Sequence, residues 1–582
     1  MPLMSFPTPV LKAACLASAI ALAGGLVAFA EHDDEHDRDH FSPGNLVLSR
    51  SVYNNDPANI AVGTTLPPNC ASTAAGCPKK GGKATNDGSL PLVWNNNLAD
   101  GSFGITSKIF LDQITPSGRF INTLEVPNSA MPGVSSGDDQ LVTSFSSKSE
   151  IALNLSTEGR RVTFMGYLAP IGAIDVSNSN TPLVVDPTNP VGENTYRAVA
   201  DVDRDGRFRF TLTNAYSGNN GRAAILNDDA QVFYTAGNAG NGGNPQPDGV
   251  IIGAGAQIVS RAHEAESAQS VGQPTPVASF NITELGLPHD KIGKDTNFRG
   301  LTAFDNVLYY SKGSGGNGVN TVYFVDTTGT ACPATSKTPG VGLPVSGASL
   351  PTMPLAYDMS HAGLQANGVA PTNMCILAGF PTLLASASTG VTNPFGLWFA
   401  NDHTFYVADE GDGTGGATPA TFYDHAAAQT AAGLQKWVLN TTTHQWTLAY
   451  TMQAGLGLGV PYTVAGYPTG NNPATGLPWA PATDGIRNIT GRVNRDGTVT
   501  VWGITSTVSG NGDQGADPNQ LVAITDRLAA TSAGSEHFTT LRTARYGEVL
   551  RGISFTPGTE VASCGDRRED DHRDCRDDHD RR

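Results

Sequence analysis

The chain is short of positive charge. It holds 36 Lys and Arg against 53 Asp and Glu in 582 residues, a formal net charge of −17. Nucleic acids and anionic lipid surfaces attract proteins largely through clustered basic side chains. Bulk electrostatic binding to either partner is therefore disfavoured.

The chain also lacks a long apolar run after its first thirty residues. Within them, Ala13 to Val27 is apolar, follows Lys12, and precedes Ala28-Phe29-Ala30, which has small residues spaced as a signal peptidase requires. The run is too short for a helix that crosses ~30 Å of bilayer, and the pattern is typical of a secretory signal peptide. We expect residues 1–30 to be removed and the mature protein to be periplasmic or extracellular, with no membrane span.

Recognisable catalytic motifs are missing. There is no H-E-x-x-H or C-x-x-C, and the sequence does not decide whether the protein is an enzyme. Six cysteines remain after Cys15 is lost with the leader, and structural disulfides are expected in an oxidising compartment. Proximity in the chain favours the pairs Cys70–Cys77, Cys332–Cys375 and Cys564–Cys575, although other connectivities stay open.

What the sequence does contain is a recurring phrase, an apolar strand rich in small residues joined to a second strand by a tight Asn/Asp/Gly turn. It occurs at Asn220–Gly237, Asn297–Gly313 and Gly485–Gly503, and its first half recurs at Leu550–Gly558. Recurrence of this kind indicates a radial or stacked repeat. With 67 Gly and 37 Pro, the composition favours an all-β fold, and we predict a β-propeller.

Alternating apolar residues and turn signals divide most of the chain into sets of four strands. The five complete sets are Ser149–Ser156, Arg161–Ala169, Tyr196–Asp203, Arg207–Thr213; Arg222–Asn227, Gln231–Ala236, Gly249–Gly253 and a strand within Gln257–Leu285; Arg299–Phe304, Val307–Lys312, Thr321–Thr327, Met374–Phe380; Phe395–Ala400, Thr404–Asp409, Leu434–Leu439, Trp446–Met452; and Ile486–Val493, Thr498–Ile504, Gln520–Thr525, Phe538–Thr543. Leu46–Val52, Lys108–Ile114 and Arg119–Val126 are left at the N-terminal side and Leu550–Phe555 at the C-terminal side. Together these four would close the ring as one mixed blade, which gives six blades.

An alternative with seven blades places another blade within Thr327–Phe380. In either case the predicted organisation is a signal peptide (1–30), an acidic His-rich tail (31–44), the propeller (45–558) and a charged His- and Cys-containing tail (559–582). Long connections between the second and third strands of each set would all emerge on one face, and such elaboration usually marks the binding face.

Three stretches resemble a group of secreted bacterial β-propeller proteins without an assigned biochemical role. They are FSPGNLVLSR (Phe41 to Arg50), GLQKWVLNTTTHQWTLAYTM (Gly433 to Met452) and LRGISFTPG (Leu550 to Gly558). The resemblance covers most of the mature chain and implies the fold and export, and it carries over no catalytic residue. Six-bladed secreted propellers also include phytase-like and lactonase-like enzymes, a likeness at fold level only.

Superposing the first strands of the blades aligns one position per blade. It is occupied by Arg551, Glu150, Arg222, Arg299, Phe395 and Arg487. Arginine forks suit carboxylate and phosphate oxygens, so one hypothesis is a cationic channel mouth that binds an anionic small molecule. The other is that these side chains bond to backbone carbonyls or nearby acids and only tie the blades together.

Calcium is the cofactor that the acidic loops suggest. Asp201, Asp203 and Asp205 follow the spacing that opens a calcium loop, but no distal Glu completes it, and an Asp-Gly hairpin turn explains the same letters. Asp409, Glu410 and Asp412 lie in a Gly-rich loop on the elaborated face, with Asp513 and Asp517 in a corresponding one. Such loops suit a calcium site and are equally ordinary solvated connections.

The two tails hold five of the twelve histidines among many carboxylates and no lysine. Loose uptake of zinc, copper or nickel is one interpretation, and a solubilising extension is the other. The sequence thus predicts a secreted propeller that binds a protein, a surface polymer or an anionic small molecule through its loop-rich face. The alternatives are a calcium-dependent hydrolase or lactonase with an anionic substrate, and sequestration of divalent metals by the tails.

Overall fold

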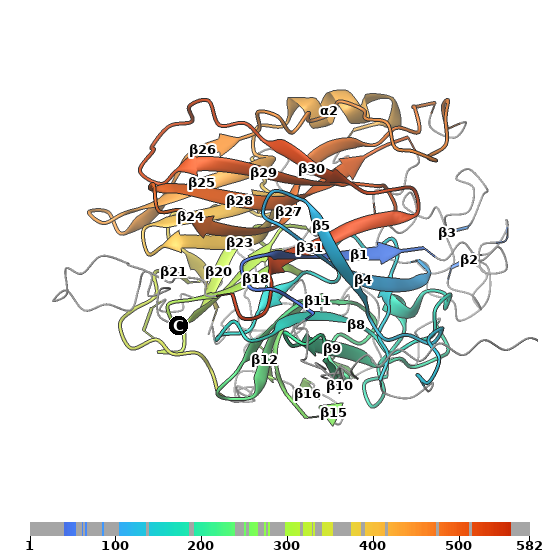
Figure 1. Cartoon of the computed structure of the whole chain (residues 1–582). Helices are drawn as coiled ribbons and strands as arrows, with labels where there is room; N and C mark the ends of the chain where they lie inside the picture. The colour runs from blue at the N-terminus through green and yellow to red at the C-terminus, as the bar shows by residue number, and fades with distance from the viewer. Residues whose placement is uncertain are drawn as a thin grey trace, which may run out of the picture. The chain divides into compact units, whose positions relative to one another are not determined.

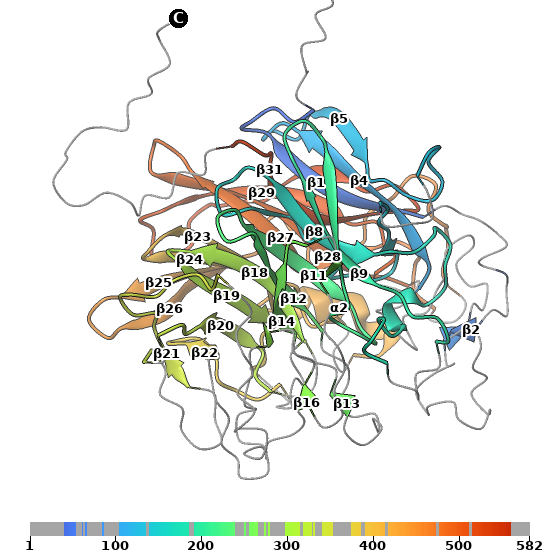
Figure 2. The ribbon, with the colours of Figure 1, turned by 90° about the horizontal axis from the view of Figure 1, so that it is seen from below.

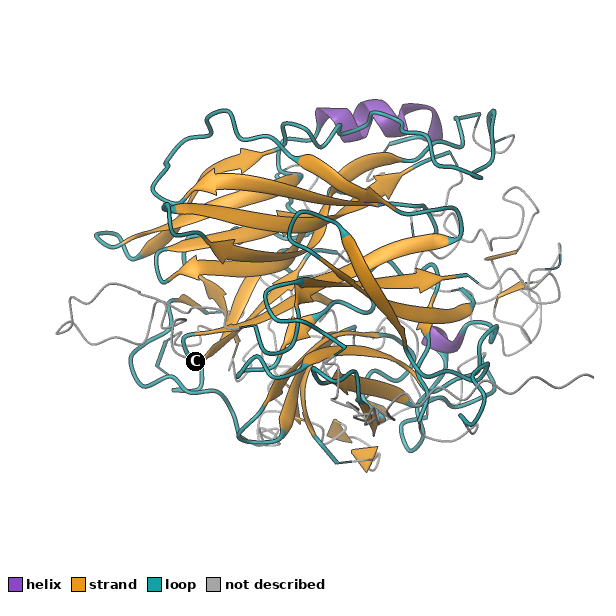
Figure 3. Cartoon of the chain, in the orientation of Figure 1, coloured by secondary structure: helices purple, strands orange, loops and turns teal. Residues whose placement is uncertain are grey.

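The chain divides into two compact units, Met1–Arg38 and Asp39–Arg582. The computed structural model describes residues 40–53, 61, 65–66, 84–85, 104–134, 139–185, 191–238, 250–251, 255–262, 264–265, 273–274, 278–279, 297–314, 318–328, 330–331, 340–352, 374–385, 390–413, 417–472, 476–510 and 515–559. These all belong to the second unit, and strands dominate them (Figure 3). Within this part, no helix has the length and apolarity needed to cross a membrane.

The strands of the second unit form a six-bladed β-propeller of antiparallel sheets. From the inner strand outward, the blades are β31 (Glu548–Phe555), β1 (Leu46–Val52), β4 (Thr106–Ile114), β5 (Phe120–Glu125); β7 (Asn154–Leu155), β8 (Val162–Tyr167), β9 (Arg197–Val202), β10 (Phe208–Thr213); β11 (Gly221–Asn227), β12 (Val232–Gly237), β14 (Ala256–Ser260), β17 (Ala278–Ser279); β18 (Phe298–Phe304), β19 (Val307–Lys312), β20 (Thr321–Val325), β22 (Met374–Leu377); β23 (Pro394–Asn401), β24 (Thr404–Asp409), β25 (Gly433–Asn440), β26 (Gln445–Met452); and β27 (Ala482–Val493), β28 (Thr498–Val508), β29 (Gln520–Arg527), β30 (Thr539–Thr543). We call them blades 1 to 6 in this order.

Further short elements lie at the edges of the blades and in the connections. The strands are β2 (Thr65–Leu66), β3 (Ala84–Thr85), β6 (Thr143–Ser144), β13 (Val250–Ile251), β15 (Glu264–Ala265), β16 (Gln273–Pro274) and β21 (Val341–Gly342). The helices are η1 (Val176–Asn178), η3 (Pro419–Thr421) and α2 (Phe422–Ala428). Helix α2 lies in the connection between β24 and β25, on the loop-rich face.

The ring is closed by strands from both ends of the described chain. β31 pairs antiparallel with β1, Leu46 opposite Phe555 and Val52 opposite Glu548, so the red and blue strands share one sheet in Figure 1. The inner strands contact each other in the cyclic order β31, β7, β11, β18, β23, β27 and back to β31. In Figure 2, β11, β18 and β27 accordingly lie near the middle of the view, and outer strands such as β5 and β26 lie near its edge. The predicted closure of the ring by Leu550–Phe555 is confirmed.

The seven-bladed alternative is wrong. Strand β20 pairs antiparallel with β22, Phe324 opposite Cys375, so the long stretch between them is an excursion within blade 4. A further blade would have separated these two strands into different sheets.

Two predicted strands also need correction. Gly249–Gly253 is not the third strand of blade 3, because β13 pairs in parallel with β16 in a separate two-stranded sheet, while β14 takes the third place against β12. The apolar run at Val250 was less informative than the stretch Ala256–Ser260, where Ala256 and Ile258 are fully buried. Ser149–Ser156 pairs only at Asn154–Leu155, since Ile151 adopts a left-handed conformation with φ 50° that interrupts a strand.

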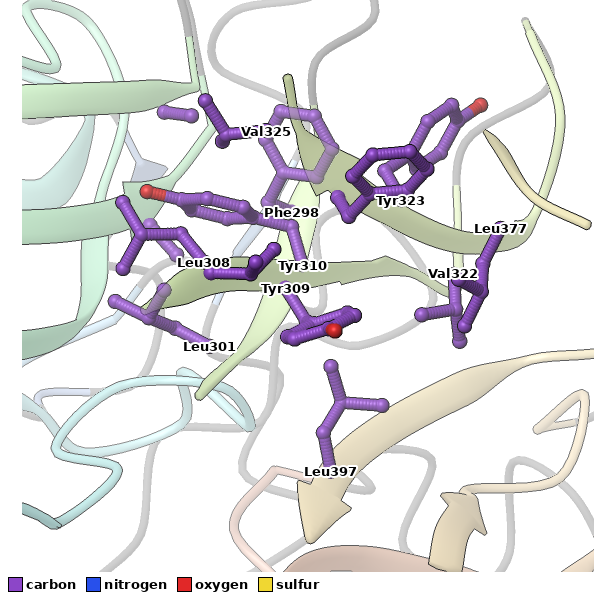
Figure 4. Packing of buried hydrophobic residues seen from close by; sticks show 14 of the residues in the cluster. Phe298, Leu301, Leu308, Tyr309, Tyr310, Val322, Tyr323, Val325, Leu377 and Leu397 are labelled. Carbon is purple, nitrogen blue, oxygen red and sulfur yellow. The ribbon is translucent and has the colours of Figure 1, made fainter. Parts of the chain in front are cut away.

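The largest hydrophobic cluster joins blades 3, 4 and 5. Figure 4 shows its centre, where Phe298, Tyr310 and Tyr323 of blade 4 pack together and Leu397 of blade 5 points toward them. Aromatic rings extend the contact between blades 4 and 5. Phe304 stacks on Phe399, with 4.6 Å between the ring centres. Adjacent blades are therefore held face to face by apolar packing, which keeps their inner edges in register.

Candidate functional site

The aligned position lies at a β-bulge on the inner strands of five blades. In blades 1, 4, 5 and 6, two inner-strand residues oppose one residue of the second strand: Arg551-Gly552 against Ser49, Arg299-Gly300 against Ser311, Phe395-Gly396 against Ala408, and Arg487-Asn488 against Ile504. In blade 3, Arg222 is the inserted residue between the pairs of Gly221 and Ala223. A bulge turns a side chain away from the regular alternation of the strand. The same local distortion thus recurs around the inner ring.

Each bulge also meets the neighbouring blade. The Ser49 hydroxyl accepts a hydrogen bond from the Gly552 amide at 2.7 Å and donates one to the Ile151 carbonyl of blade 2 at 2.7 Å. Ser311 repeats this arrangement, accepting from the Gly300 amide at 2.8 Å and donating to the Phe395 carbonyl of blade 5. The recurring phrase therefore encodes a blade-to-blade joint as well as a hairpin.

The joints continue around the ring with other donors. Asn488 Nδ2 donates to the Arg551 carbonyl at 2.6 Å, the Ala152 amide donates to the Arg222 carbonyl at 3.2 Å, and Arg222 Nη1 donates to the Phe298 carbonyl at 2.8 Å. These contacts support part of the hypothesis that the aligned side chains tie blades together. Whether these arginines could also bind a ligand depends on the nitrogen atoms that these contacts leave over.

A group of charged side chains gathers at this inner ring, and we call it the axial cluster. It consists of Lys148, Glu150, Arg222, Arg299, Glu410, Asp484 and Arg487, from blades 2 to 6 or the segments that lead into and out of their strands. The four arginines of the aligned position are at most 5 % exposed, and Lys148 is partly buried. The predicted channel-mouth residues are thus enclosed rather than open to solvent.

Glu410 is the carboxylate that the cations surround. Its Oε2 lies 3.2 Å from Arg487 Nε and its Oε1 lies 3.5 Å from Arg299 Nη1. Burial opposes its ionisation, but Arg299, Lys148 and Arg487 together hold the pKa of Glu410 below its usual value. Glu410 is therefore ionised at neutral pH.

The loop before Asp412 projects Glu410 toward the ring. Gly411 has φ +76° and packs against Asp484, and a Cβ on Gly485 would lie 2.5 Å from the Asp409 carbonyl oxygen. Glycine is required at both positions: at Gly411 for its backbone conformation and at Gly485 for the close approach of another backbone. The Ser506 hydroxyl fixes the loop further by donating to the Glu410 carbonyl.

The other two carboxyls of the cluster behave differently. Burial raises the pKa of Glu150, although Tyr167, Thr143 and the Ser144 amide donate hydrogen bonds to it. Burial also raises the pKa of Asp484 well above its usual value, even though the Gly413 amide donates to it at 2.9 Å. Both groups thus hold a proton more tightly than an exposed carboxyl does.

Burial lowers the pKa values of cations in the cluster, because it disfavours their charged forms. Burial lowers the pKa of Lys148 to about 8, with Arg487 and Arg299 adding to the effect and Glu410 opposing it. Burial and the neighbouring Arg299 also lower the pKa of Arg222. Positive charge is therefore crowded in this place, because low-dielectric surroundings strengthen repulsion between like charges.

Two arginine nitrogen atoms of the cluster lack hydrogen bonds. Among the described residues, neither Arg222 Nε nor Arg299 Nη1 has a hydrogen-bond partner, though each atom is buried. An unpaired buried donor costs free energy that a suitable acceptor would recover. Arg551 donates to the carbonyls of Phe145 and Gly515, the latter at 2.9 Å.

The predicted calcium ligands on the elaborated face each engage different partners. Asp409 accepts the Asn393 and Gly411 amides at 2.8 and 3.0 Å, Glu410 faces the arginines, and Asp412 lies 3.4 Å from His425 Nδ1. Burial raises the pKa of Asp409 to about 6. Of the second predicted loop, Asp513 lies outside the described residues, and Asp517 accepts the Tyr467 hydroxyl at 2.6 Å.

The Asp201–Gly206 segment is held by arginines and by its own turn. Asp201 is fully buried and binds Arg161 at 2.8 Å and Arg261 at 2.7 Å, while Asp205 pairs with Arg207 at 2.7 Å. Asp203 accepts the amides of Asp205 and Arg207 at 3.1 and 2.9 Å, as in a turn closed by an aspartate side chain. A pocket of about 330 Å³ lies here, lined by Arg160, Arg161, Asp203, Arg204, Asp205, Asp228, Gln231 and Arg261.

Within the described part of the chain, no three His, Cys, Asp or Glu side chains are placed to hold a metal ion. Calcium binding stays a prediction. Cys375 lies buried in β22, and the other six cysteines lie outside the described residues, as do the tails apart from residues at their inner ends. The three disulfide pairs and metal uptake by the tails likewise stay predictions.

Sequence reasoning missed Lys148 and Asp484. Lys148 lies two residues before Glu150 and Asp484 three residues before Arg487, so both flank the aligned position. No equivalent residue recurs in the other blades, and alignment of the repeats therefore could not reveal them. Attention to charged residues next to the aligned position would have been the available signal.

Comparisons with known proteins assign no family. No protein-family model and no curated protein matches the chain. Among solved structures, the chain is similar to a protein from Lactobacillus plantarum, with 12 % identity over 76 % of this chain and 81 % of that chain and a TM-score of 0.29. It is also similar to a Synechocystis apocarotenoid oxygenase, with 9 % identity over 78 % of this chain and 60 % of that chain and a TM-score of 0.19. Neither likeness bears on function, and the fold rests on the strand pairing described above.

Proposed function

We propose that the protein is a secreted binding protein whose propeller holds a small anionic ligand, a carboxylate or a phosphate, at the axial cluster. The observation that carries the proposal is the convergence of Lys148, Arg222, Arg299 and Arg487 around Glu410. Burying like charges together is costly unless a counter-ion or hydrogen-bond acceptor joins them. An anion with several oxygens meets both needs.

The unpaired Arg222 Nε supports a ligand rather than a purely structural role. Arg222 is only 3 % exposed, and its Nη1 is already engaged with the Phe298 carbonyl and the Asn297 side chain. Arginine is suited to offer its unpaired Nε to an oxyanion, since its planar fork matches carboxylate and phosphate geometry.

The position of the cluster fits recognition at the loop-rich face. In a four-stranded antiparallel blade, the inner strand begins at one end of the blade. The connection between the second and third strands emerges from that same end. Those connections are long in blade 1, between β1 and β4, and in blade 5, where they contain α2. Repeat scaffolds commonly place binding residues on the elaborated face.

Thermal unfolding with added anions tests the proposal. We expect inorganic phosphate or malonate, at constant ionic strength, to raise the melting temperature of the mature protein in a saturable way. The effect should be lost in Arg222→Gln and kept in Arg119→Gln. Arg119 is exposed in the turn between β4 and β5, so this control makes the same change of net charge away from the inner ring. Equal responses of the two variants would refute binding at the axial cluster.

The calcium-dependent hydrolase is the competing interpretation. It requires carboxylates that are free to bind a metal, whereas Asp409 and Asp412 already engage amides, Gln435 or His425. We therefore expect EDTA to leave the melting temperature unchanged. A large drop that calcium reverses would favour the hydrolase instead.

A further inference from the structure

An asparagine stands two residues before the aligned arginine where the chain enters the inner strands of blades 3 and 4. The two segments are Asn220–Arg222 and Asn297–Arg299. In each, the asparagine Nδ2 donates a hydrogen bond to a serine hydroxyl, Ser147 at 3.0 Å in the first segment and Ser314 at 2.7 Å in the second. An asparagine and a serine therefore accompany the arginine twice around the inner ring.

Beside the first of these pairs, the protein itself supplies a carboxylate. Asn220 Nδ2 also lies 3.4 Å from Glu150 Oε1, and the Ser147 hydroxyl donates to the same carboxyl group. Thr143 and Tyr167 add further hydrogen bonds to it. The hydroxyl and amide donors at this place thus have an acceptor, as buried polar groups require.

Beside the second pair, the serine hydroxyl has no acceptor of this kind. Ser314 Oγ accepts hydrogen bonds from Asn297 Nδ2 and from Nε and Nη2 of Arg299, and it donates none to the residues that the structure describes. A hydroxyl group has two lone pairs and one hydrogen. Three N–H groups therefore exceed what the oxygen can accept, and its own hydrogen is left for an acceptor that the described part of the chain does not supply.

Asn297 also joins this serine to Arg222. Its Oδ1 accepts a hydrogen bond from Arg222 Nη1, which donates to the Phe298 carbonyl as well, at 2.8 Å. Arg222 Nε is buried and has no hydrogen-bond partner among the described residues. The asparagine amide thus holds the guanidinium and the Ser314 hydroxyl in a fixed relation, and each of these two groups offers one unused hydrogen.

On the basis of the proposed function, we infer that Asn297 and Ser314 belong to the anion site. The Ser314 hydroxyl donates to the anion that Arg222 binds, and Asn297 is the positioning residue that holds both donors. The anion plays the part at Ser314 that the Glu150 carboxylate plays at Ser147. A carboxylate or phosphate oxygen suits this place, because hydrogen bonds to ionised acceptors are the stronger ones.

The location of the two residues gives the anion a way in. Asn297 directly precedes β18 and Ser314 follows β19, so both stand at the open end of this hairpin, away from its turn at Asp305 and Asn306. Both side chains are partly buried, whereas Arg222 is only 3 % exposed. An anion that arrives from solvent therefore reaches the serine and the asparagine before the arginine.

Calorimetric titration of the mature protein with malonate, at constant ionic strength, tests the inference. We expect Ser314→Ala to weaken binding about tenfold, because a hydrogen bond to a charged group is lost. Ser314→Thr keeps the hydroxyl and should bind malonate as the wild type does. Ser346→Ala is the matched control, since it removes an exposed hydroxyl from the connection between β21 and β22.

Asn297→Asp places a carboxylate of the protein where the anion would act. The aspartate keeps an acceptor for Arg222, gains the hydrogen of Ser314 and adds a negative charge, so malonate binding should weaken on the order of a hundredfold. Without malonate, the variant should melt at least as high as the wild type. Asn440→Asp adds the same charge at an exposed turn, where the side-chain oxygen accepts the Thr442 amide at 2.9 Å, and should change neither property.

The outcomes separate the inference from the proposed function. If Arg222→Gln abolishes malonate binding while Ser314→Ala and Asn297→Asp bind as the wild type does, the inference is wrong and anion binding at the axial cluster stands. If malonate does not bind to the wild type, both are wrong. Should Asn297→Asp fail to fold, equal affinities of Ser314→Ala and Ser314→Thr would still contradict the inference.

Discussion

In blades 1, 4 and 5 the residue that follows the aligned position is glycine, because another blade lies against it. Gly300 and Gly396 approach the carbonyls of Phe395 and Arg487, and a Cβ there would lie 1.9 and 2.5 Å from the respective oxygens. Neither glycine has a positive φ, so close approach rather than backbone conformation explains them. At these positions the aligned residue is thus followed by the glycine that lets two backbones meet.

Replacing Gly300 by alanine tests this explanation. The new Cβ would overlap the Phe395 carbonyl oxygen, which belongs to the backbone and cannot swing aside. We expect Gly300→Ala to lower the free energy of unfolding by about 2 kcal/mol or more. Gly192→Ala is the matched control, because nothing lies within 4 Å of its added Cβ, and it should change stability by less than about 0.5 kcal/mol. Urea denaturation of both variants measures the difference, and equal effects would contradict the joint.

Between elements, buried carboxylates join neighbouring blades away from the ring. Asp112 of β4 is fully buried and binds Arg50 of its own blade at 2.9 Å and Arg542 of blade 6 at 2.7 Å. Asp201 links blades 2 and 3 through Arg161 and Arg261 in the same way. Asp526 links blades 5 and 6 by binding Lys436, and both side chains are fully buried. Apolar packing brings the blades together, and these pairs specify which side chains meet.

The Asp112 pair gives a prediction for the interface of blades 1 and 6. Although burial opposes its ionisation, hydrogen bonds and charge from Arg50, with help from Thr123 and Arg542, lower the pKa of Asp112. We expect Asp112→Asn to destabilise the fold by about 3 kcal/mol at neutral pH, because two arginines lose their buried counter-charge. A group with a lowered pKa stabilises the fold above its unfolded pKa and stops doing so as pH falls through the folded value. The deficit of the variant should therefore shrink below about pH 4.

The control for this pair is Asp402→Asn. The Asp402 carboxylate pairs with His403 at 2.6 Å but is 70 % exposed, and such surface pairs contribute little. Chemical denaturation at pH 7 and pH 3.5 should show no large change for this variant. A deficit of Asp112→Asn that stays constant with pH would argue against the ion pairs as its cause.

How much the sequence foretold differs between the elements and the site. Hairpins such as Arg299–Phe304 with Val307–Lys312 could be predicted, because turn residues and the alternation of apolar and polar side chains are local signals. The aligned arginines could be predicted because they recur at the same position of several blades. Lys148 and Asp484 were not, since they occur in single blades and approach Glu410 only through the closed ring. The interruption at Ile151 was also hidden, because its left-handed backbone is imposed by packing rather than by residue type.

For the molecule as a whole, the two histidine-bearing tails can be separated from the propeller by truncation. The metal-sequestration alternative predicts that zinc or copper binding disappears in a chain reduced to residues 41–563. The described propeller residues contain no cluster of metal donors, so we expect the truncated protein to keep its fold and to lose any such binding. If the truncated protein retained all the metal, the tails would not be the metal-binding segments. Circular dichroism and calorimetric titration with zinc supply the two readouts.

Buried carboxyls with raised pKa values set the upper limit of the stable pH range. Burial raises the pKa of Asp517 to about 7, against hydrogen bonds from Tyr467, Ser509 and Thr507, and it raises the pKa of Asp409 to about 6. In both cases the folded pKa exceeds the unfolded value, so their stabilising effect is complete at low pH and is lost as pH rises through the folded pKa. Asp112 acts in the opposite direction below about pH 4. These groups together predict greatest stability near pH 4, with a progressive loss from there to about pH 7.

Asp517→Asn tests the upper limit, because an amide keeps an acceptor for Tyr467 and cannot ionise. The melting temperature of the wild type should fall between about pH 4 and 7, and that of the variant should fall less. The variant therefore gains on the wild type as pH rises, even if it is less stable at pH 5. Asp402→Asn, at an exposed site, should follow the wild type throughout. Parallel curves for Asp517→Asn and the wild type would show that Asp517 does not take up its proton on folding, and would point to Asp409 as the group that limits stability.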